Sequence, residues 1–442
     1  MKSAAAPSST IVRLPLEVLE IFIQYSPIST QLAISRVCRF FHALSLRPLY
    51  RNVSLGSPAV VIACCKTLIA NPSAAKAVRS LSISYTYYSA SSNSLLSAYY
   101  SIIKRALTVP SGLHTLKLLV HDPYFVTLLN QHIFPALRQF ECYLTPSIRL
   151  IDFLNRHPKI TYLQISPNEN TSKSAEQDCP LPTLDLPRLQ YFAGNVQGVP
   201  CLGTACIIRA AILNWNIMDT DPDLAFSVLQ RSSSATLALL SCRRRGWNLD
   251  LIEMVSLRLP GILSLHVFNI LLVDSRPTQT YLDAIRSCLI RFPRLQRLEI
   301  NCVDYWEMGN ISCSLDEDLS TVTEWGEACL SLTEITLPHS NDLSWYKISE
   351  RVWIPDPKHI AGAAWLSDAV ASKQHHKWGA IAEGLKRTVT KTGTPPPEST
   401  DTIANVRVHL EDLLRSSTEA TLIRDDRDRG RTPLIAEARR SV

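Results

Sequence analysis

Three aspartates near the middle of the sequence have the types and spacing that come closest to a metal site. Asp219, Asp221 and Asp223 alternate with single residues, and clustered carboxylates are the ligands that calcium prefers. Pro222 interrupts the cluster, and the glycine and the distal glutamate of a calcium-binding loop are missing. Acidic residues also gather at the start of a helix, where they face its positive end. The sequence favours this second interpretation, with a helix that begins before Leu224.

Histidines and cysteines show no metal-ligand or catalytic spacing. His375 and His376 are the only adjacent histidines, and no cysteine or carboxylate stands at ligand spacing from them. Cys201 and Cys206 lie close together without a second pair nearby, so both are expected in an apolar core. The HExxH, GxSxG, CxxC, GxGxxG and GxxxxGK(S/T) motifs are absent. We therefore expect no catalytic residue, no metal and no cofactor.

A run of three arginines, from Arg243 to Arg245, follows an expected strand. Guanidinium groups bind carboxylates and phosphates, so this run could contact an acidic or phosphorylated partner. A run of like charges is also what an exposed, solvated loop carries. The sequence favours the exposed loop.

Charge, thiol content and hydropathy exclude several classes of protein. The chain of 442 residues has 45 Lys and Arg and 39 Asp and Glu, and this net charge of +6 does not indicate nucleic-acid binding. Its 12 cysteines follow no pattern, which fits a reducing compartment, the cytoplasm and/or the nucleus. The most apolar stretches, 58–70 and 201–213, are interrupted by Lys66 and Arg209 and are too short to cross a bilayer. We expect neither a nucleic-acid partner nor a membrane.

A short apolar signature of the form L-x-x-L-x-L recurs along most of the chain. Between its copies lie stretches with the apolar period of a helix, of which 278–292 is the clearest. A strand followed by a helix cannot bury its apolar face alone, so units of this kind stack on their neighbours. The pattern predicts a strand–helix array, and an ordinary α/β domain without true repeats is the alternative. Copies begin at Val78, Leu113, Leu137, Ile160, Leu189, Leu237, Ile262, Leu295 and Leu332.

The segment 12–53 has a different pattern, which predicts two helices and a short extended exit. The first helix begins at Leu14-Pro15, because proline is tolerated in a first turn. The second is expected to end at Pro48, because the residue before a proline disfavours helical geometry. About forty residues cannot bury much surface alone, so this segment must pack on a partner or on the rest of the chain. Its apolar faces are Val18, Leu19, Phe22 and Ile23, then Leu32, Val37, Phe40, Phe41 and Leu44.

This segment closely resembles the F-box. Three groups occur in the family's order and at its separations: Leu14-Pro15 with Glu17-Val18-Leu19, then Val37-Cys38-Arg39-x-Phe41, then Leu49-Tyr50-Arg51. Pro27 is a departure, but it stands where the family has a variable connection. The resemblance implies docking to a Skp-type adaptor and, through it, to a cullin. The implied adaptor-binding residues, some of which must instead hold the helices together, are Leu14, Pro15, Val18, Leu19, Phe22, Val37, Cys38, Phe41 and Leu44.

The recurring signature resembles the degenerate leucine-rich repeats that follow an F-box in many fungal proteins. The Asn or Cys that ends each ladder in regular repeats is not consistently present, and the repeat lengths vary. The implied fold is α/β, with an N-terminal helical F-box, an irregular leucine-rich-repeat-like strand–helix solenoid and a disordered C-terminal tail.

Composition divides the chain into five expected parts. Trp345, Tyr346, Trp353 and Trp365 gather after the last repeat and are expected to close the open end of its core. Beyond residue 388 the prolines and low hydrophobicity indicate disorder. The parts are a flexible lead (1–11), the F-box (12–55), the solenoid (56–345), a C-terminal cap (346–387) and a largely disordered tail (388–442).

These observations predict a non-catalytic subunit of a Skp–cullin–F-box ubiquitin ligase. The F-box would dock the adaptor, the repeats would hold an unknown protein substrate, and other subunits would transfer ubiquitin. The alternative is a protein-interaction scaffold outside any ligase, in which the F-box-like hairpin only caps the solenoid. An enzyme is the third possibility, and no motif supports it.

Overall fold

The described part of the chain consists of two compact units, divided between Ile270 and Leu271. Several expectations fall outside it: the flexible lead, Asp219 and Asp221, the pair His375-His376, and the tail from residue 388. The computed structural model describes residues 14–85, 96–167, 182–215, 222–233, 235–270, 277–302, 315–337, 343–349, 352–356 and 359–371.

Three short helices begin the first unit. They are α1 (Leu16–Tyr25), α2 (Ile28–Ser35) and α3 (Arg39–Arg51). α1 starts directly after Pro15, and Pro27 directly precedes α2. The prediction of two helices was wrong, because the chain turns at residues 36–38 and divides the second helix.

Pro48 lies inside α3 and does not end it, so this prediction was also wrong. The helix continues through Pro48 to Arg51. Because Pro48 is in the last turn, its missing N–H removes one hydrogen bond near the helix end. α3 also packs against α5 (Pro72–Ala77) and leads into β1 (Asn52–Leu55), and this packing offsets the loss.

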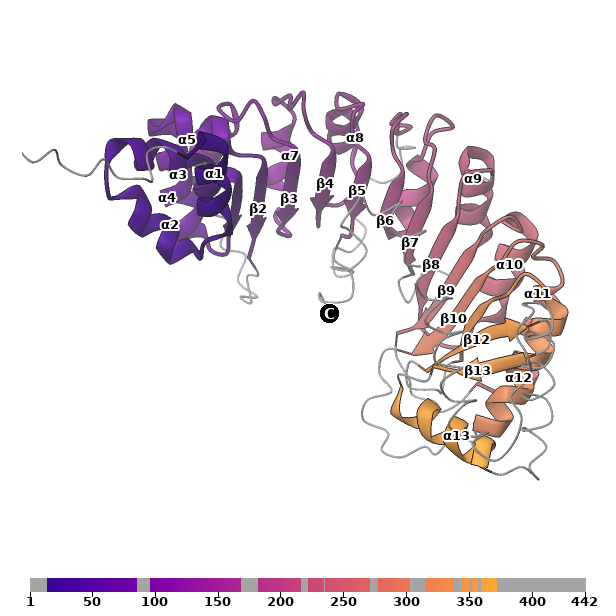
Figure 1. Cartoon of the computed structure of the whole chain (residues 1–442). Coiled ribbons are helices and arrows are strands. Elements are labelled where there is room, and N and C mark those ends of the chain that lie inside the picture. Colours follow the sequence, from indigo (N-terminus) through magenta and orange to yellow (C-terminus); the bar gives the residue numbers. More distant parts are fainter. Residues whose placement is uncertain are drawn as a thin grey trace, which may run out of the picture. The chain divides into compact units, whose positions relative to one another are not determined.

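A ladder of parallel strands forms the sheet of the first unit. Each strand pairs with the next one in the sequence, so the order in the sheet is the order in the chain (Figure 1). This order is the one that a strand–helix array predicts, and it confirms the α/β class. After β1 the strands are β2 (Ser80–Ser84), β3 (Thr115–Leu119), β4 (Gln139–Cys142), β5 (Tyr162–Ile165), β6 (Tyr191–Asn195), β7 (Ala210–Asn214), β8 (Leu239–Arg244) and β9 (Ser264–Asn269).

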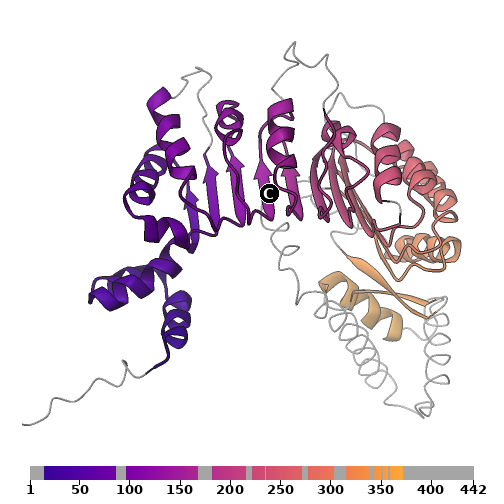
Figure 2. The same cartoon turned by 90° about the horizontal axis from the view of Figure 1, so that it is seen from above.

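Helices connect these strands and cover one face of the sheet (Figure 2). Side chains at their N-termini explain where several of them start, because a cap accepts a hydrogen bond from an otherwise unpaired N–H. Ser57, Asn71 and Ser147 cap α4, α5 and α8 in this way. The remaining elements are α4 (Pro58–Ala70), α6 (Ser97–Leu107), α7 (Tyr124–Leu129), α8 (Ile148–Asn155), the 3₁₀ helix η3 (Val196–Cys201), α9 (Asp223–Ser233) and α10 (Leu249–Arg258).

The apolar signature occupies the same register in successive repeats. Leu116 of β3 stands beside Leu81 of β2 and Phe140 of β4, and all three side chains are buried. Cys142 of β4 and Cys242 of β8 hold the next inward position on their strands and are fully buried. A slip of one residue would turn a strand's inward row to the other face, so the core fixes the register.

β7 was not predicted from the sequence. Its copy of the signature begins at Ile208, but the second position is Ala211 instead of a large apolar residue. Ala211 is nevertheless fully buried and stands between Phe192 of β6 and Leu240 of β8. Large buried side chains occupy the paired positions on both sides of Ala211, and the ladder continues through it without a break.

The second unit combines parallel and antiparallel pairing. β10 (Arg297–Cys302) pairs in parallel with β11 (Glu334–Thr336), which pairs antiparallel with β12 (Ser344–Ser349). β12 in turn pairs antiparallel with β13 (Val352–Pro355). The helices of this unit are α11 (Gln279–Leu289), α12 (Leu315–Ala328) and α13 (Ile360–Ala371).

Buried tryptophans form the core of the second unit. Trp345 of β12 packs edge-on against Trp365 of α13, with ring centroids 5.6 Å apart. The indole Nε1 of Trp365 donates a hydrogen bond of 2.9 Å to Asp316 in the first turn of α12. α12 begins at Leu315, and its acidic residues 316–318 suit the positive end of a helix.

Candidate docking surface on the N-terminal helices

An apolar surface is exposed on the three N-terminal helices. Half of the large apolar side chains that are exposed in the described residues lie between residues 14 and 40, and the others lie singly along the chain. Single exposed apolar residues are ordinary, whereas a concentration of them marks an interaction site. The residues, which we call the docking face, are Leu14, Leu16, Val18, Ile21, Phe22, Tyr25, Ile28, Leu32, Val37 and Phe40.

The nine residues with implied adaptor-binding roles fall into three groups by exposure. Leu14, Pro15, Val18, Phe22, Val37 and Cys38 are exposed. Phe41 and Leu44 are partly exposed. Leu19 is buried, with 6% of its surface exposed, and Ile23 one turn later is 1% exposed. Leu19 therefore belongs to the buried side of α1, which packs on α3. Four residues of the exposed group belong to the docking face, namely Leu14, Val18, Phe22 and Val37.

Polar contacts hold the three helices together without using the docking face. The side-chain amide of Gln31 donates hydrogen bonds to the carbonyls of Gln24 (3.3 Å) and Ser26 (2.9 Å), and this ties α2 to the end of α1. Glu20 of α1 forms an ion pair of 3.2 Å with Arg47 of α3. These contacts and the buried side of α1 position the helices, which leaves the exposed apolar side chains available to a partner.

The docking face is joined to the array through α3 and β1. β1 pairs in parallel with β2, with Asn52 beside Ser80. The backbone N–H of Arg79 also donates a 2.9 Å hydrogen bond to the carbonyl of Arg51. In Figure 2 the darkest helices, at the start of the chain, lie to one side of the strand–helix array.

The sheet face opposite the helices carries mostly polar side chains. Lys117 and Glu141 form an ion pair of 3.1 Å between β3 and β4. On β5 the hydroxyl of Tyr162 donates a 3.0 Å hydrogen bond to Gln164. Burial and then the charge of Glu141 raise the pKa of Tyr162 to about 12, so it keeps this donor proton near neutral pH. This face offers fixed hydrogen-bonding groups to a partner.

The three consecutive arginines have three different surroundings. Arg243 and Arg244 belong to β8, so the run is part of a strand and not only of a loop. The guanidinium of Arg243 lies 5.6 Å from the ring centroid of Phe268, and Arg244 forms a 2.9 Å ion pair with Asp250. Arg245 is exposed. The run is therefore not a single cationic surface.

The remaining candidates for chemistry do not assemble into a site. Within the described ranges no group of three or more His, Cys, Asp or Glu residues could hold a metal ion. Burial raises the pKa of both Cys201 and Cys206, and the Cys206 thiol donates to the carbonyl of Leu184 at 3.3 Å. Asp223 at the start of α9 forms an ion pair of 2.8 Å with Arg258. Across those ranges, no helix is long and apolar enough to span a membrane.

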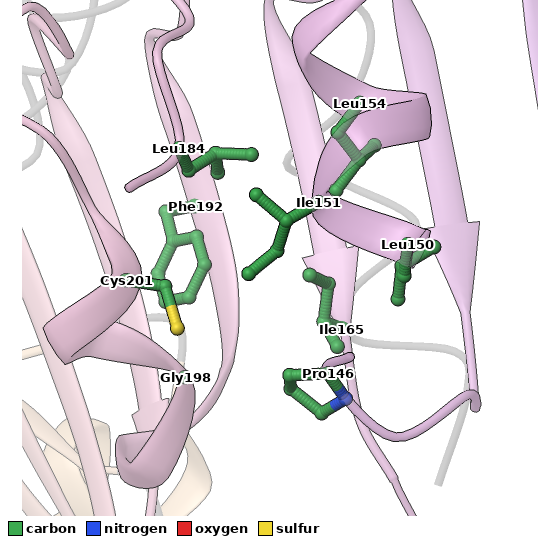
Figure 3. A pocket seen from close by; sticks show the side chains of 9 residues that line it. All are labelled: Pro146, Leu150, Ile151, Leu154, Ile165, Leu184, Phe192, Gly198 and Cys201. Carbon is green, nitrogen blue, oxygen red and sulfur yellow. The ribbon is translucent and has the colours of Figure 1, made fainter. Parts of the chain in front are cut away.

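A small apolar cavity lies between α8 and η3 (Figure 3). Ile151, Leu184 and Phe192 point toward one another across it, and Cys201 lies on the η3 side. Its volume is about 10 Å³, roughly the smallest space that holds a single water molecule. It is a packing gap and not a ligand site.

No protein-family model matches the chain, and no curated protein matches it. Among solved structures the chain is similar to TLR13 in a TLR13–ssRNA13 complex, with a TM-score of 0.30 and 15% identity over 59% of this chain and 32% of that one. It is also similar to LegL7, a leucine-rich repeat-containing protein from Legionella pneumophila, with a TM-score of 0.30 and 13% identity over 72% of this chain and 88% of that one. The chain thus spans about a third of the length of TLR13.

Proposed function

We propose that this protein is a substrate receptor that docks a Skp-type adaptor through the docking face and holds a protein partner on its strand–helix array. The observation that carries the proposal is the concentration of exposed apolar side chains on α1–α3, in the segment that resembles the F-box. A standard protein interface buries about 800 Å² on each partner. Ten large apolar side chains, each at least 45% exposed, offer a surface of that order.

The exposed apolar residues have a thermodynamic reason to bind. Phe22 is 66% exposed, Val37 is 70% exposed and Tyr25 is 83% exposed, so water contacts most of each side chain. Transfer of such groups from water into an interface contributes about 25 cal/mol per Å² of apolar surface. Through the adaptor this chain would join a cullin-based ubiquitin ligase. It would act by raising the local concentration of its partner near the transfer enzyme.

Co-purification with the adaptor tests this proposal. The full chain carrying Val18→Asp and Phe22→Asp should bind a co-expressed Skp-type adaptor at least roughly thirtyfold more weakly, the cost of a hot spot of about 2 kcal/mol. Both side chains are exposed, so the helices should keep their fold. The control variant carries Leu96→Asp and Leu224→Asp, two exposed leucines outside the docking face, and should bind normally. A folded wild-type chain that binds no adaptor at micromolar concentration would contradict the proposal.

An interaction scaffold outside any ligase is the second candidate. It is favoured by the packing of α3 on α5 and by the pairing of β1 with β2, which make the N-terminal helices a cover for the first repeat. Deletion of residues 1–55 removes α1 to α3 and β1, the elements that cover the first repeat, and separates the two proposals. If the helices only cap the array, the deletion should lower the urea midpoint of the array. In a receptor that midpoint should be retained and adaptor binding should be lost.

A further inference from the structure

Positive charge is concentrated in the first part of the chain. Residues 14–167 contain 14 Lys and Arg against 5 Asp and Glu, although the net charge of all 442 residues is only +6. The rest of the chain therefore carries a net negative charge. A local excess of this size creates a field that attracts acidic partners and speeds their association.

Part of this charge forms a row across the N-terminal ends of the first four strands. Arg51, Arg79, His114 and Arg138 each directly precede one of the strands β1 to β4. Backbone hydrogen bonds link them in order: Arg79 donates to Arg51 (2.9 Å), His114 to Arg79 (2.8 Å) and Arg138 to His114 (2.8 Å). Neighbouring strands lie about 4.8 Å apart, so these four residues, which we call the basic row, span roughly 15 Å.

The arginines of the basic row have no acidic partner in the described structure. No described carboxylate forms an ion pair with Arg51, Arg79 or Arg138, whereas Glu20 and Glu141 are each paired with another base. The pKa of His114 is lowered first by its partial burial and then by the charges of these three arginines. The positive charges of the three arginines therefore act together around His114, and none of them is neutralised by a described carboxylate.

A hollow of about 230 Å³ adjoins the basic row between α3 and α5. Arg79 belongs to both features, and its Nη1 atom donates to the carbonyls of Lys76 (2.8 Å) and Val78 (3.1 Å). Its guanidinium lies against Gly112, where an added methyl group would collide with it. The hollow thus has a fixed guanidinium at one side, and its lining mixes cationic and apolar residues: Ala43, Leu46, Arg47, Ser73, Lys76, Ala77 and Arg79.

We propose that the basic row and the adjoining hollow bind an extended, Asp- and Glu-rich segment of a partner protein. An extended chain places the side chains of one face roughly 7 Å apart, so two or three carboxylates can meet the row over its roughly 15 Å. The apolar part of the hollow suits the methylene groups of a glutamate. The inference names a class of partner for the array, and so it rests on the proposal that the array holds a protein.

Two other anions fit the basic row less well. Single-stranded nucleic acids bind where aromatic side chains stack on the bases, and neither the row nor the hollow contains Phe, Tyr or Trp. A phosphoryl group concentrates nearly two charges at one point. The basic row instead spreads single charges evenly over several strands, which matches the single charges of successive acidic side chains.

Fluorescence anisotropy with a labelled twelve-residue Asp- and Glu-rich peptide tests the proposal on the full chain. The double variant Arg79→Glu and Arg138→Glu should weaken binding by roughly tenfold or more, with a lower association rate. The control variant Lys66→Glu and Arg231→Glu makes the same charge change at exposed positions off the row and should weaken binding by less than about threefold. Binding should also weaken as salt is raised, because salt screens exposed charges.

A second variant changes the position of a guanidinium without changing charge. Gly112→Ala should displace the Arg79 side chain and weaken peptide binding by roughly threefold, while the flexible arginine yields without unfolding the chain. Gly56→Ala is the matched control, since nothing lies within 4 Å of the added methyl group.

Several outcomes would overturn the inference. They are no binding of the acidic peptide at millimolar concentration, equal losses in the two double variants, or tighter binding of a phosphoserine peptide or an oligothymidylate of equal charge. The basic-row variants should keep adaptor binding, and Val18→Asp with Phe22→Asp should keep peptide binding. A failure of this inference is thereby distinguished from a failure of the adaptor proposal.

Discussion

The indole of Trp353 occupies the space that a side chain at residue 326 would need. A methyl group added at Gly326 would lie 2.6 Å from Nε1 and 2.8 Å from two ring carbons of Trp353, which is itself 2% exposed. Alanine normally favours a helix over glycine by up to about 1 kcal/mol, but overpacking a core costs about 1–3 kcal/mol. We expect Gly326→Ala to lower the free energy of unfolding by about 1–2 kcal/mol, measured by urea denaturation. A gain in stability would show that the indole can move aside.

His157 makes the stability of the first unit depend on pH. Its Nδ1 donates to the carbonyl of Phe153 (2.6 Å) and its Nε2 accepts from the N–H of Phe134 (2.9 Å), an arrangement that requires a neutral ring. Burial lowers the pKa of His157 in the folded chain; the hydrogen bond to Phe153 opposes this effect in part, and the charge of Arg156 adds to it. Below about pH 6.5 the unfolded chain therefore binds a proton that the folded chain does not, and stability falls with falling pH.

Urea midpoints measured between pH 7.5 and 5 check this expectation. The fall should not exceed about 1.4 kcal/mol per pH unit for this one group. His157→Gln cannot titrate, so its midpoint should fall less steeply over the same range. Equal slopes in both proteins would assign the pH dependence to His114 and His132, whose pKa values burial also lowers.

Residue periodicity predicted only part of the docking face. Leu19 and Ile23 stand one turn apart and are buried, as the helical period predicts, while Phe22 between them is exposed. Tyr25 and Ile28 are also exposed, and the sequence gives no sign of this. An apolar residue on a helix is expected to face a core, and only the arrangement of the three helices decides which residues face solvent.

At the scale of the elements, burial of alternate residues holds each strand in its register. On β2, Leu81 is buried, while Ser82 is partly exposed on the opposite face. Leu81→Ala should lower the free energy of unfolding by about 2–5 kcal/mol, because it removes a buried side chain and leaves a cavity. Ser82→Ala, next to it on the same strand, should change it by less than about 0.5 kcal/mol. Equal effects in urea denaturation would contradict this register.

The signature predicted most of the parallel strands, including β6 and β8, whose copies are incomplete, and it missed three other strands. Strand β7 was not predicted, because Ala211 stands where the signature has a large apolar residue, although Ala211 is buried between Phe192 and Leu240. The antiparallel pair β12 and β13 was not predicted, because its residues belong to no copy of the signature. The turn at residues 36–38 contains neither glycine nor proline, so no local residue type indicated it.

At the scale of the whole molecule, the change from parallel to antiparallel strand pairing comes after β11, whereas the excess of positive charge ends near residue 167. The first unit is a ladder of parallel strands with one face covered by helices, and the second unit contains an antiparallel hairpin of its own. The ladder follows from the recurring signature and was predictable. The basic row was not predictable, because its four residues are far apart in the sequence and only parallel pairing brings them together at the N-terminal ends of the strands.

Two cysteines buried in the inward positions of the strands, Cys142 and Cys242, can report how fast their parts of the ladder open. Burial raises the pKa of Cys142 to about 12 and also raises that of Cys242, so neither thiol reacts while its strand is closed. A thiol reagent should label exposed Cys38 at once and these two only when the ladder opens, as followed by peptide mass spectrometry. Labelling of Cys142 as fast as Cys38 in native buffer would show that β4 is open. Because the two cysteines lie on β4 and β8, the difference between their labelling times measures whether the ladder opens strand by strand or all at once.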